Sequence, residues 1–202
     1  MIISHRYRFI FVKTSKTAGT SIEAYLSGVC ADDDILTPVA PAVAPHRARN
    51  HEAYYNHMPA RQIAARVPEL WRSYYRFCVE RNPWDKVLSA YHMFRNSAFH
   101  GGDGTLTLES YLATGILPHN APLYTIDGAV AVDRVLRYER LDAELAQTFA
   151  ALGVPFEGTM PFRAKSEWRD DRRPYREVLS AAQAARIGEL FAEEIRLHGY
   201  VY

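Results

Sequence analysis

The chain has 202 residues, a length that suits one compact domain with a full hydrophobic core. Apolar residues make up 48% of it and charged residues 23%, as in ordinary globular proteins, and the formal net charge is +1. So small a net charge excludes a global field that attracts nucleic acid or an anionic membrane. Any bound anion must therefore be held by a local arrangement of residues.

The two cysteines, Cys30 and Cys78, have no partner at metal-ligand spacing, and we expect both to pack as small apolar residues. No disulfide framework is implied, charge appears early at the N-terminus, and no apolar run approaches the roughly 20 residues that span a bilayer. We therefore expect a cytoplasmic protein with no membrane or nucleic-acid partner.

In chain order, the first predicted element is the apolar run 8–12, the pattern of a buried parallel strand. A polar loop over 13–19 and a helix from Thr20 follow it. Residues 31–60 are rich in proline and are expected to be irregular, with the acidic triplet 32–34 as a solvated turn.

The second half of the pattern repeats this alternation of strands and helices. A buried strand is predicted over 75–80, followed by a helix with Asn82 as its N-cap and Pro83 at its first position. Further elements are then predicted in the order of a helix from 108 to about 114, a strand over 134–138, a helix over 141–152, an Arg-rich segment over 161–177 and an amphipathic helix over 180–197. The alternation predicts an α/β fold: one three-layer domain over residues 1–202 with a central, mostly parallel sheet.

The loop after the first strand has the chemistry of a phosphate cradle. It joins a strand to a helix N-terminus, where backbone N–H groups and the helix dipole favour an anion. Gly19 permits close approach of the backbone, Lys16 adds positive charge, and hydroxyls come from Thr17, Thr20 and Ser21. The lysine precedes the glycine, so this P-loop-like segment is not a Walker A loop. A capped helix with Lys16 in solvent is the plainer interpretation of the same residues.

A second motif follows the second predicted strand. Arg81 stands at the strand end, where α/β sheets bind ligands, and Ser89 lies seven residues after Asn82, on the same side of the helix. An arginine fork and a serine hydroxyl are suited to gripping one phosphate. The structural alternative is that Asn82 only caps the helix and Ser89 only packs. These roles are compatible with phosphate binding.

Together the two segments resemble the sulfotransferases that use 3′-phosphoadenosine 5′-phosphosulfate (PAPS), in particular the branch that includes carbohydrate sulfotransferases. The resemblance implies that Lys16, Thr17, Ala18, Gly19, Thr20 and Ser21 contact the 5′-phosphosulfate, and that Arg81 and Ser89 contact the 3′-phosphate. Lys86 departs from the family, which usually has Arg there, at a position we expect to be structural. The Arg-rich segment resembles a late loop over the nucleotide and adds Lys165 and Arg172.

An acceptor hydroxyl must lose its proton as it attacks sulfur, and histidine suits that task near neutral pH. In the resembling family a histidine precedes the arginine motif at a similar distance and accepts this proton, which implies His57 here. His51 and Glu52 are the reserves. Packing beside a short helix is the structural alternative for His57.

The predicted function is transfer of a sulfuryl group from PAPS to a hydroxyl or amine of a small-molecule or carbohydrate acceptor, by in-line displacement and without a metal. Positioning and electrostatic stabilisation are what this chemistry needs. Two alternatives are a small-molecule kinase with a degenerate phosphate loop and a noncatalytic module that binds an adenine nucleotide. The irregular segments 31–60 and 97–125 are expected to shape the acceptor pocket.

Overall fold

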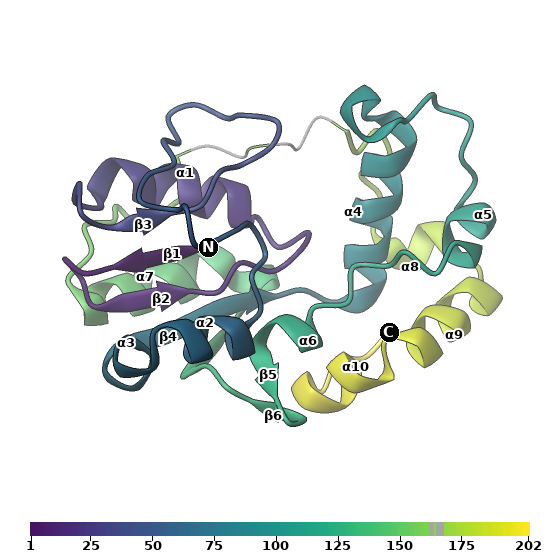
Figure 1. Ribbon diagram of the computed structural model, residues 1–202. Coiled ribbons are helices and arrows are strands. Elements are labelled where there is room, and N and C mark those ends of the chain that lie inside the picture. The colour runs from purple at the N-terminus through teal and green to yellow at the C-terminus, as the bar shows by residue number, and fades with distance from the viewer. Residues whose placement is uncertain (162–163, 165–167) are drawn as a thin grey trace. The chain divides into compact units, whose positions relative to one another are not determined.

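The computed structural model of the chain describes residues 1–161, 164 and 168–202 (Figure 1). These residues group into two compact units. Unit 1 comprises Met1–Glu80 and Asn120–Ala164, and unit 2 comprises Arg81–His119 and Lys165–Tyr202. Each unit buries a hydrophobic cluster of its own.

Unit 1 is built on a five-stranded sheet in the order β3-β1-β2-β4-β7. The three strands β2 (Phe9–Phe11), β4 (Tyr75–Glu80) and β7 (Arg134–Arg137) run parallel. The short strands β1 (Ile2–Ser4) and β3 (Ile35–Leu36) continue the sheet in antiparallel fashion. Because parallel strands end at the same edge of a sheet, the segments that follow β2 and β4 leave from one edge.

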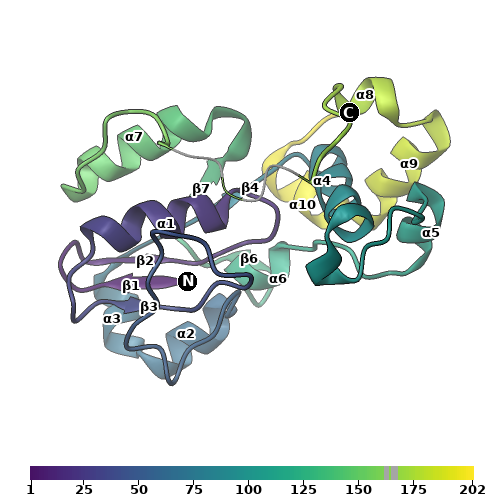
Figure 2. The same ribbon diagram turned by 90° about the horizontal axis from the view of Figure 1, so that it is seen from above.

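Helices cover both faces of this sheet, as the two views in Figures 1 and 2 show. Helices α1 (Gly19–Val29) and α7 (Leu141–Leu152) lie on one face, and α2 (Ala60–Arg66) and α3 (Pro68–Ser73) lie on the other. Apolar side chains of α1 and α7 pack with those of the strands in one buried cluster. The α/β class, the three layers and the central, mostly parallel sheet are thus confirmed.

The second chain segment of unit 1, Asn120–Ala164, also contains several short elements. They are α6 (Ala121–Tyr124), the hairpin of β5 (Thr125–Ile126) and β6 (Ala129–Val130), and the 3-10 turn η2 (Tyr138–Arg140).

Unit 2 is helical in its described residues. Its longest element is α4 (Pro83–Asn96), followed by the 3-10 turn η1 (Ala98–His100) and α5 (Leu108–Ala113). The later segment adds α8 (Tyr175–Val178), α9 (Ala181–Leu190) and α10 (Ala192–His198). Apolar residues of α4, α5 and α9 form its core.

The predicted starts of two helices, α4 and α9, are confirmed, and each has an N-cap side chain that forms a hydrogen bond. The side chain of Asn82 accepts a hydrogen bond from the Trp84 N–H at 3.1 Å, and Pro83 opens α4. At α9, Ser180 and Gln183 form a reciprocal capping box. Such caps satisfy N–H groups that a helix end would otherwise leave unpaired.

Three expectations from the sequence were wrong. The single helix over 180–197 is two helices, α9 and α10, because the backbone of Phe191 leaves the helical region between them. The region 31–60 contains β3, and the sheet also gains β1, whose three residues are too few to show a pattern. Asp34 is not solvated: it is fully buried, and its carboxylate accepts hydrogen bonds from Ser4 and from the backbone of His5.

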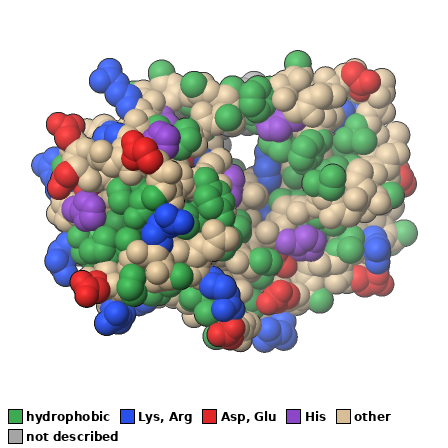
Figure 3. All heavy atoms as spheres, in the orientation of Figure 1, with side chains coloured by type: hydrophobic (Ala, Val, Ile, Leu, Met, Phe, Trp, Pro, Cys, Tyr) green, Lys and Arg blue, Asp and Glu red, His purple; other side chains and the backbone are tan. Residues whose placement is uncertain are grey.

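Among the residues that the structure describes, every helix is too short or too polar to span a lipid bilayer. On the face drawn in Figure 3, basic and acidic side chains are interspersed, in keeping with the small net charge of the chain.

Candidate functional site

The loop between β2 and α1 has the backbone geometry of an anion-binding nest. Lys16 and Ala18 both take left-handed conformations, with φ of 62° and 63°, on either side of Thr17. Alternation of this kind turns successive N–H groups toward one side, which makes a concavity for an anion. Left-handed conformations are uncommon for residues other than glycine and cluster at ligand sites. Ala18 is the N-cap residue of α1 and has no side-chain acceptor for the N–H groups of the first turn.

Gly19 is required for close packing rather than for an unusual φ. A Cβ at this position would lie 2.8 Å from Cγ of Lys13, which is too close for real atoms. Lys13 itself is buried, and its Nζ lies 2.5 Å from Oε2 of the buried Glu23. Lys16, by contrast, is half-buried. Of the two lysines in the loop, Lys13 is therefore the one whose side chain is buried and paired with a carboxylate.

Hydrogen bonds join both ends of the loop to neighbouring segments. The Thr14 hydroxyl donates to the carbonyl of Val79 in β4. The Thr17 hydroxyl lies 2.8 Å from the Thr14 hydroxyl and 3.2 Å from the Thr14 carbonyl oxygen, so it is engaged within the loop. The buried Ser21 hydroxyl accepts a hydrogen bond from the N–H of Ala164 at 2.9 Å.

Asn120 holds the middle of the loop, and the sequence analysis did not identify it. Its side-chain amide pairs with the backbone of Ser15, accepting from the N–H at 2.8 Å and donating to the C=O at 3.1 Å. The same amide donates to Glu80 at 3.0 Å, and Tyr124 donates to the other oxygen of Glu80 at 3.0 Å. All of these side chains are buried in unit 1. Asn120 thus ties the loop to the end of β4.

His57 lies beside this loop in unit 1. Its Nδ1 is 3.2 Å from the carbonyl oxygen of Lys13, and a carbonyl only accepts, so Nδ1 carries the proton and Nε2 has the lone pair. Burial lowers the pKa of His57 to about 4, and the positive charge of Lys13 adds to this effect. The imidazole is therefore neutral near pH 7, with Nε2 able to accept a proton. His57 is also held at a left-handed φ of 59°.

The reserve residues lie in different surroundings. Glu52 is exposed to solvent and His51 is half-buried. His46, the third histidine of this region, has its Nε2 2.9 Å from the carbonyl oxygen of Thr37. No contact of His51 or Glu52 with the loop is described, whereas His57 contacts the loop at Lys13.

In unit 2, Arg81 is almost fully buried at the start of α4 and is held by Asp85. Its Nε and one terminal nitrogen donate to one carboxylate oxygen of Asp85 at 2.9 and 2.6 Å. Arg169 donates to the other oxygen of Asp85 at 2.6 Å. Burial works to raise the pKa of Asp85, but the two guanidinium groups hold it below its ordinary value. Asp85 therefore stays ionised and orients Arg81.

The remaining predicted cofactor residues come from the second motif and from the Arg-rich segment. Ser89 is half-buried on α4, and Arg172 is exposed. Lys86 is fully buried, with Nζ 3.8 Å from Glu194 and 5.0 Å from the ring centre of Phe191, as expected of a structural position. Lys165 lies outside the described residues. In the part of the chain that the structure describes, no group of three or more His, Cys, Asp or Glu side chains is placed to hold a metal ion.

In unit 1, His57 contacts the loop at Lys13, three residues before Lys16. In unit 2, Arg81 lies just before α4 and Ser89 lies on this helix. Sequence reasoning missed Asn120, Asp85 and Arg169. The spacing of four residues between Arg81 and Asp85 is a signal for a helical ion pair. Asn120 and Arg169 meet their partners across 105 and 84 residues, respectively, and no local pattern marks such contacts.

Comparison with known proteins identifies the fold. The mouse sulfotransferase SULT7A1, whose crystal structure is complexed with PAP, aligns with a TM-score of 0.57 over 96% of this chain and 86% of its own, at 15% sequence identity. The chain therefore has a sulfotransferase-like fold. No family model matches its sequence.

The chain belongs to the same family as an uncharacterized protein of Archaeoglobus fulgidus. The two are 32% identical over 106 residues, which cover 50% of this chain and 86% of the archaeal protein.

Proposed function

We propose that the chain is a PAPS-dependent sulfotransferase that moves the sulfuryl group to a hydroxyl or amine of a small-molecule or carbohydrate acceptor and releases adenosine 3′,5′-bisphosphate (PAP). The observation that carries this proposal is the combination, in unit 1, of an anion nest at Lys16–Ala18 with a neutral His57 fixed to the backbone of Lys13. The PAP complex of the structural neighbour supports the choice of nucleotide.

In this proposal each group has one task. The N–H groups around Ala18 and the α1 N-terminus hold the 5′-phosphosulfate with Thr17, Gly19, Thr20 and Ser21. Lys16 stabilises the negative charge that builds on the bridging oxygen as the sulfur–oxygen bond breaks. Nε2 of His57 accepts the proton of the attacking acceptor.

The 3′-phosphate is assigned to Arg81 and Ser89, with Lys165 and Arg172 as further cofactor contacts. A guanidinium already oriented by a carboxylate loses little freedom when it binds a phosphate, so Asp85 supports Arg81 in this role. We propose transfer without a metal, because a lysine and a helix N-terminus can supply the electrostatic stabilisation that the reaction needs.

The test is a screen of hydroxyl and amine acceptors with PAPS labelled at sulfur. Label should move to at least one acceptor with the wild-type chain and not with a Lys16→Ala variant. PAP binding that survives while every acceptor stays unlabelled would instead identify a noncatalytic nucleotide-binding module. Magnesium-dependent ATP binding with phosphoryl transfer would identify a kinase.

A further inference from the structure

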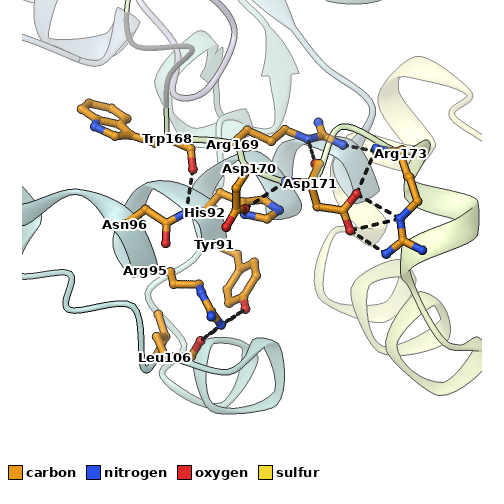
Figure 4. Close-up of polar contacts among 10 residues, drawn as sticks. All are labelled: Tyr91, His92, Arg95, Asn96, Leu106, Trp168, Arg169, Asp170, Asp171 and Arg173. Atoms are coloured by element: carbon orange, nitrogen blue, oxygen red, sulfur yellow. Dashed lines mark hydrogen bonds and ion pairs between the residues drawn. The ribbon is translucent and has the colours of Figure 1, made fainter.

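Unit 2 contains a cavity of about 650 Å³ whose lining includes no residue assigned above to PAPS or to the proton acceptor. Its polar lining comes from Gln183 of α9, from α4 and from the segment 170–173, and the close-up in Figure 4 labels the residues of the last two. They are Tyr91, His92, Arg95, Asp170, Asp171 and Arg173. Leu88, Leu108 and Val178 add an apolar wall. A cavity of this size is within the range of small-molecule sites.

His92 is the feature of this cavity that points to a ligand. The residue is 5% exposed, and its Nδ1 lies 2.7 Å from Oδ1 of Asp170. Its Nε2 is buried and meets no hydrogen-bond partner among the described residues. Buried polar atoms are nearly always paired in proteins, so an unpaired one that lines a cavity needs an explanation.

The surroundings fix the form of this imidazole. Burial lowers the pKa of His92, although the nearby charge of Asp170 works to raise it, so the ring is neutral near pH 7. The carboxylate beside Nδ1 favours the tautomer with its proton there, which leaves the lone pair on Nε2. Nε2 is therefore an acceptor that calls for an O–H or N–H donor.

The charges of the lining are already balanced. Arg173 donates to Asp171 at 2.6–3.2 Å, and Arg95 donates to the Tyr91 hydroxyl and the Leu106 carbonyl, both at 3.0 Å. The two arginines, two aspartates and neutral His92 sum to no formal charge. Such a lining does not favour a strongly charged ligand.

We propose that this cavity is a binding site for a neutral ligand that donates an O–H or N–H hydrogen bond to Nε2 of His92 and packs an apolar face against Tyr91 and Leu108. The site goes beyond the proposed transfer, because none of its lining residues is assigned there to PAPS or to the proton acceptor.

The experiment compares two probes of nearly the same shape, 2-phenylethanol and its methyl ether, by titration of the full chain. The alcohol has the O–H donor and the ether lacks it. The alcohol should bind about tenfold more tightly, the effect of one hydrogen bond in a buried site. The nitrogen NMR signal of His92 Nε2 should also shift on binding. His92→Phe keeps a ring but removes the acceptor, and should bring the two affinities to within about twofold. His198→Gln, a histidine of unit 2 outside this cavity, should keep the preference.

Equal affinity of the wild-type chain for the two probes would overturn the proposal, as would an unchanged His92 signal at saturation. The NMR measurement uses the unmodified chain, so the proposal remains testable if His92→Phe fails to fold. No readout here involves PAPS, so failure of this site and failure of the proposed transferase activity are separate results.

Discussion

Lys13 and Lys16 belong to one loop, but their surroundings suit different tasks. Lys13 is committed to Glu23 in the interior, whereas Lys16 lies at the nest. We predict that Lys16→Ala lowers kcat by on the order of 10²-fold or more, as loss of a charge-stabilising donor does. The free energy of unfolding should hardly change. Steady-state kinetics together with denaturant unfolding measure both, and a variant that keeps more than half of the wild-type turnover would remove Lys16 from the mechanism.

His57 gives a prediction about the pH dependence of activity. Its pKa near 4 places the acidic limb of the pH–rate profile below the roughly 6.5 of an ordinary histidine. His57→Ala should abolish transfer while PAP affinity stays within about twofold, because the base faces the acceptor. A profile of kcat/KM against pH for the wild-type chain locates the limb. Retained activity with an unchanged profile in the variant would redirect the search to His51 and Glu52.

The same pKa predicts how stability depends on pH. Because the folded-state pKa of His57 is lowered, the unfolded chain binds a proton at this residue near pH 6.5, where the folded chain does not. The contribution of neutral His57 is therefore complete above about pH 6.5 and is lost as the pH falls toward about 4. Urea unfolding at pH 7 and pH 5 should show a larger loss of stability for the wild-type chain than for His57→Gln. Equal losses would contradict the lowered pKa.

At the scale of elements, Asn120 and Tyr124 offer a matched pair of variants. Both side chains donate to Glu80 at the end of β4, but only Asn120 also pairs with the backbone of Ser15. Asn120→Ala and Tyr124→Phe should each lower the free energy of unfolding by about 1–3 kcal/mol, because each leaves a buried oxygen of Glu80 without that donor. Only Asn120→Ala should also weaken PAP binding, through the loosened loop. Calorimetric titration of both variants makes the comparison, and equal weakening in the two would mean that Asn120 does not position the loop.

The elements that could be predicted from sequence are those with a local signature. Residues 75–80 and 141–152 were predicted with the observed bounds, because a short, mostly apolar segment and a helical period are visible there. Strand β1, with three residues, and β3, with two, are too short for periodicity and depend on pairing with distant residues. The break at Phe191 lies inside a continuous apolar period, so a single helix was the natural expectation. In the same way, the loop motif was visible in the sequence. The hydrogen bonds between Asn120 and the backbone of Ser15 were not, because the two residues are 105 positions apart.

At the scale of the whole molecule, one sulfotransferase domain over residues 1–202 stays a prediction. Two compact units, each with a buried cluster, are described here. If the chain is one cooperative domain, calorimetry should show a single unfolding transition whose calorimetric and van't Hoff enthalpies agree. Two resolved transitions would contradict a single domain.

The 3′-phosphate distinguishes the proposed nucleotide from other adenine nucleotides. Arg81 and Ser89 are assigned to this phosphate, and a charge-assisted hydrogen bond contributes roughly 1.5–3 kcal/mol. The most direct measurement is therefore calorimetric titration of the wild-type chain with PAP and with adenosine 5′-monophosphate, under the same salt and pH. We predict that PAP binds at least about tenfold more tightly. Equal affinity for the two nucleotides would contradict the assignment of this chain to PAPS.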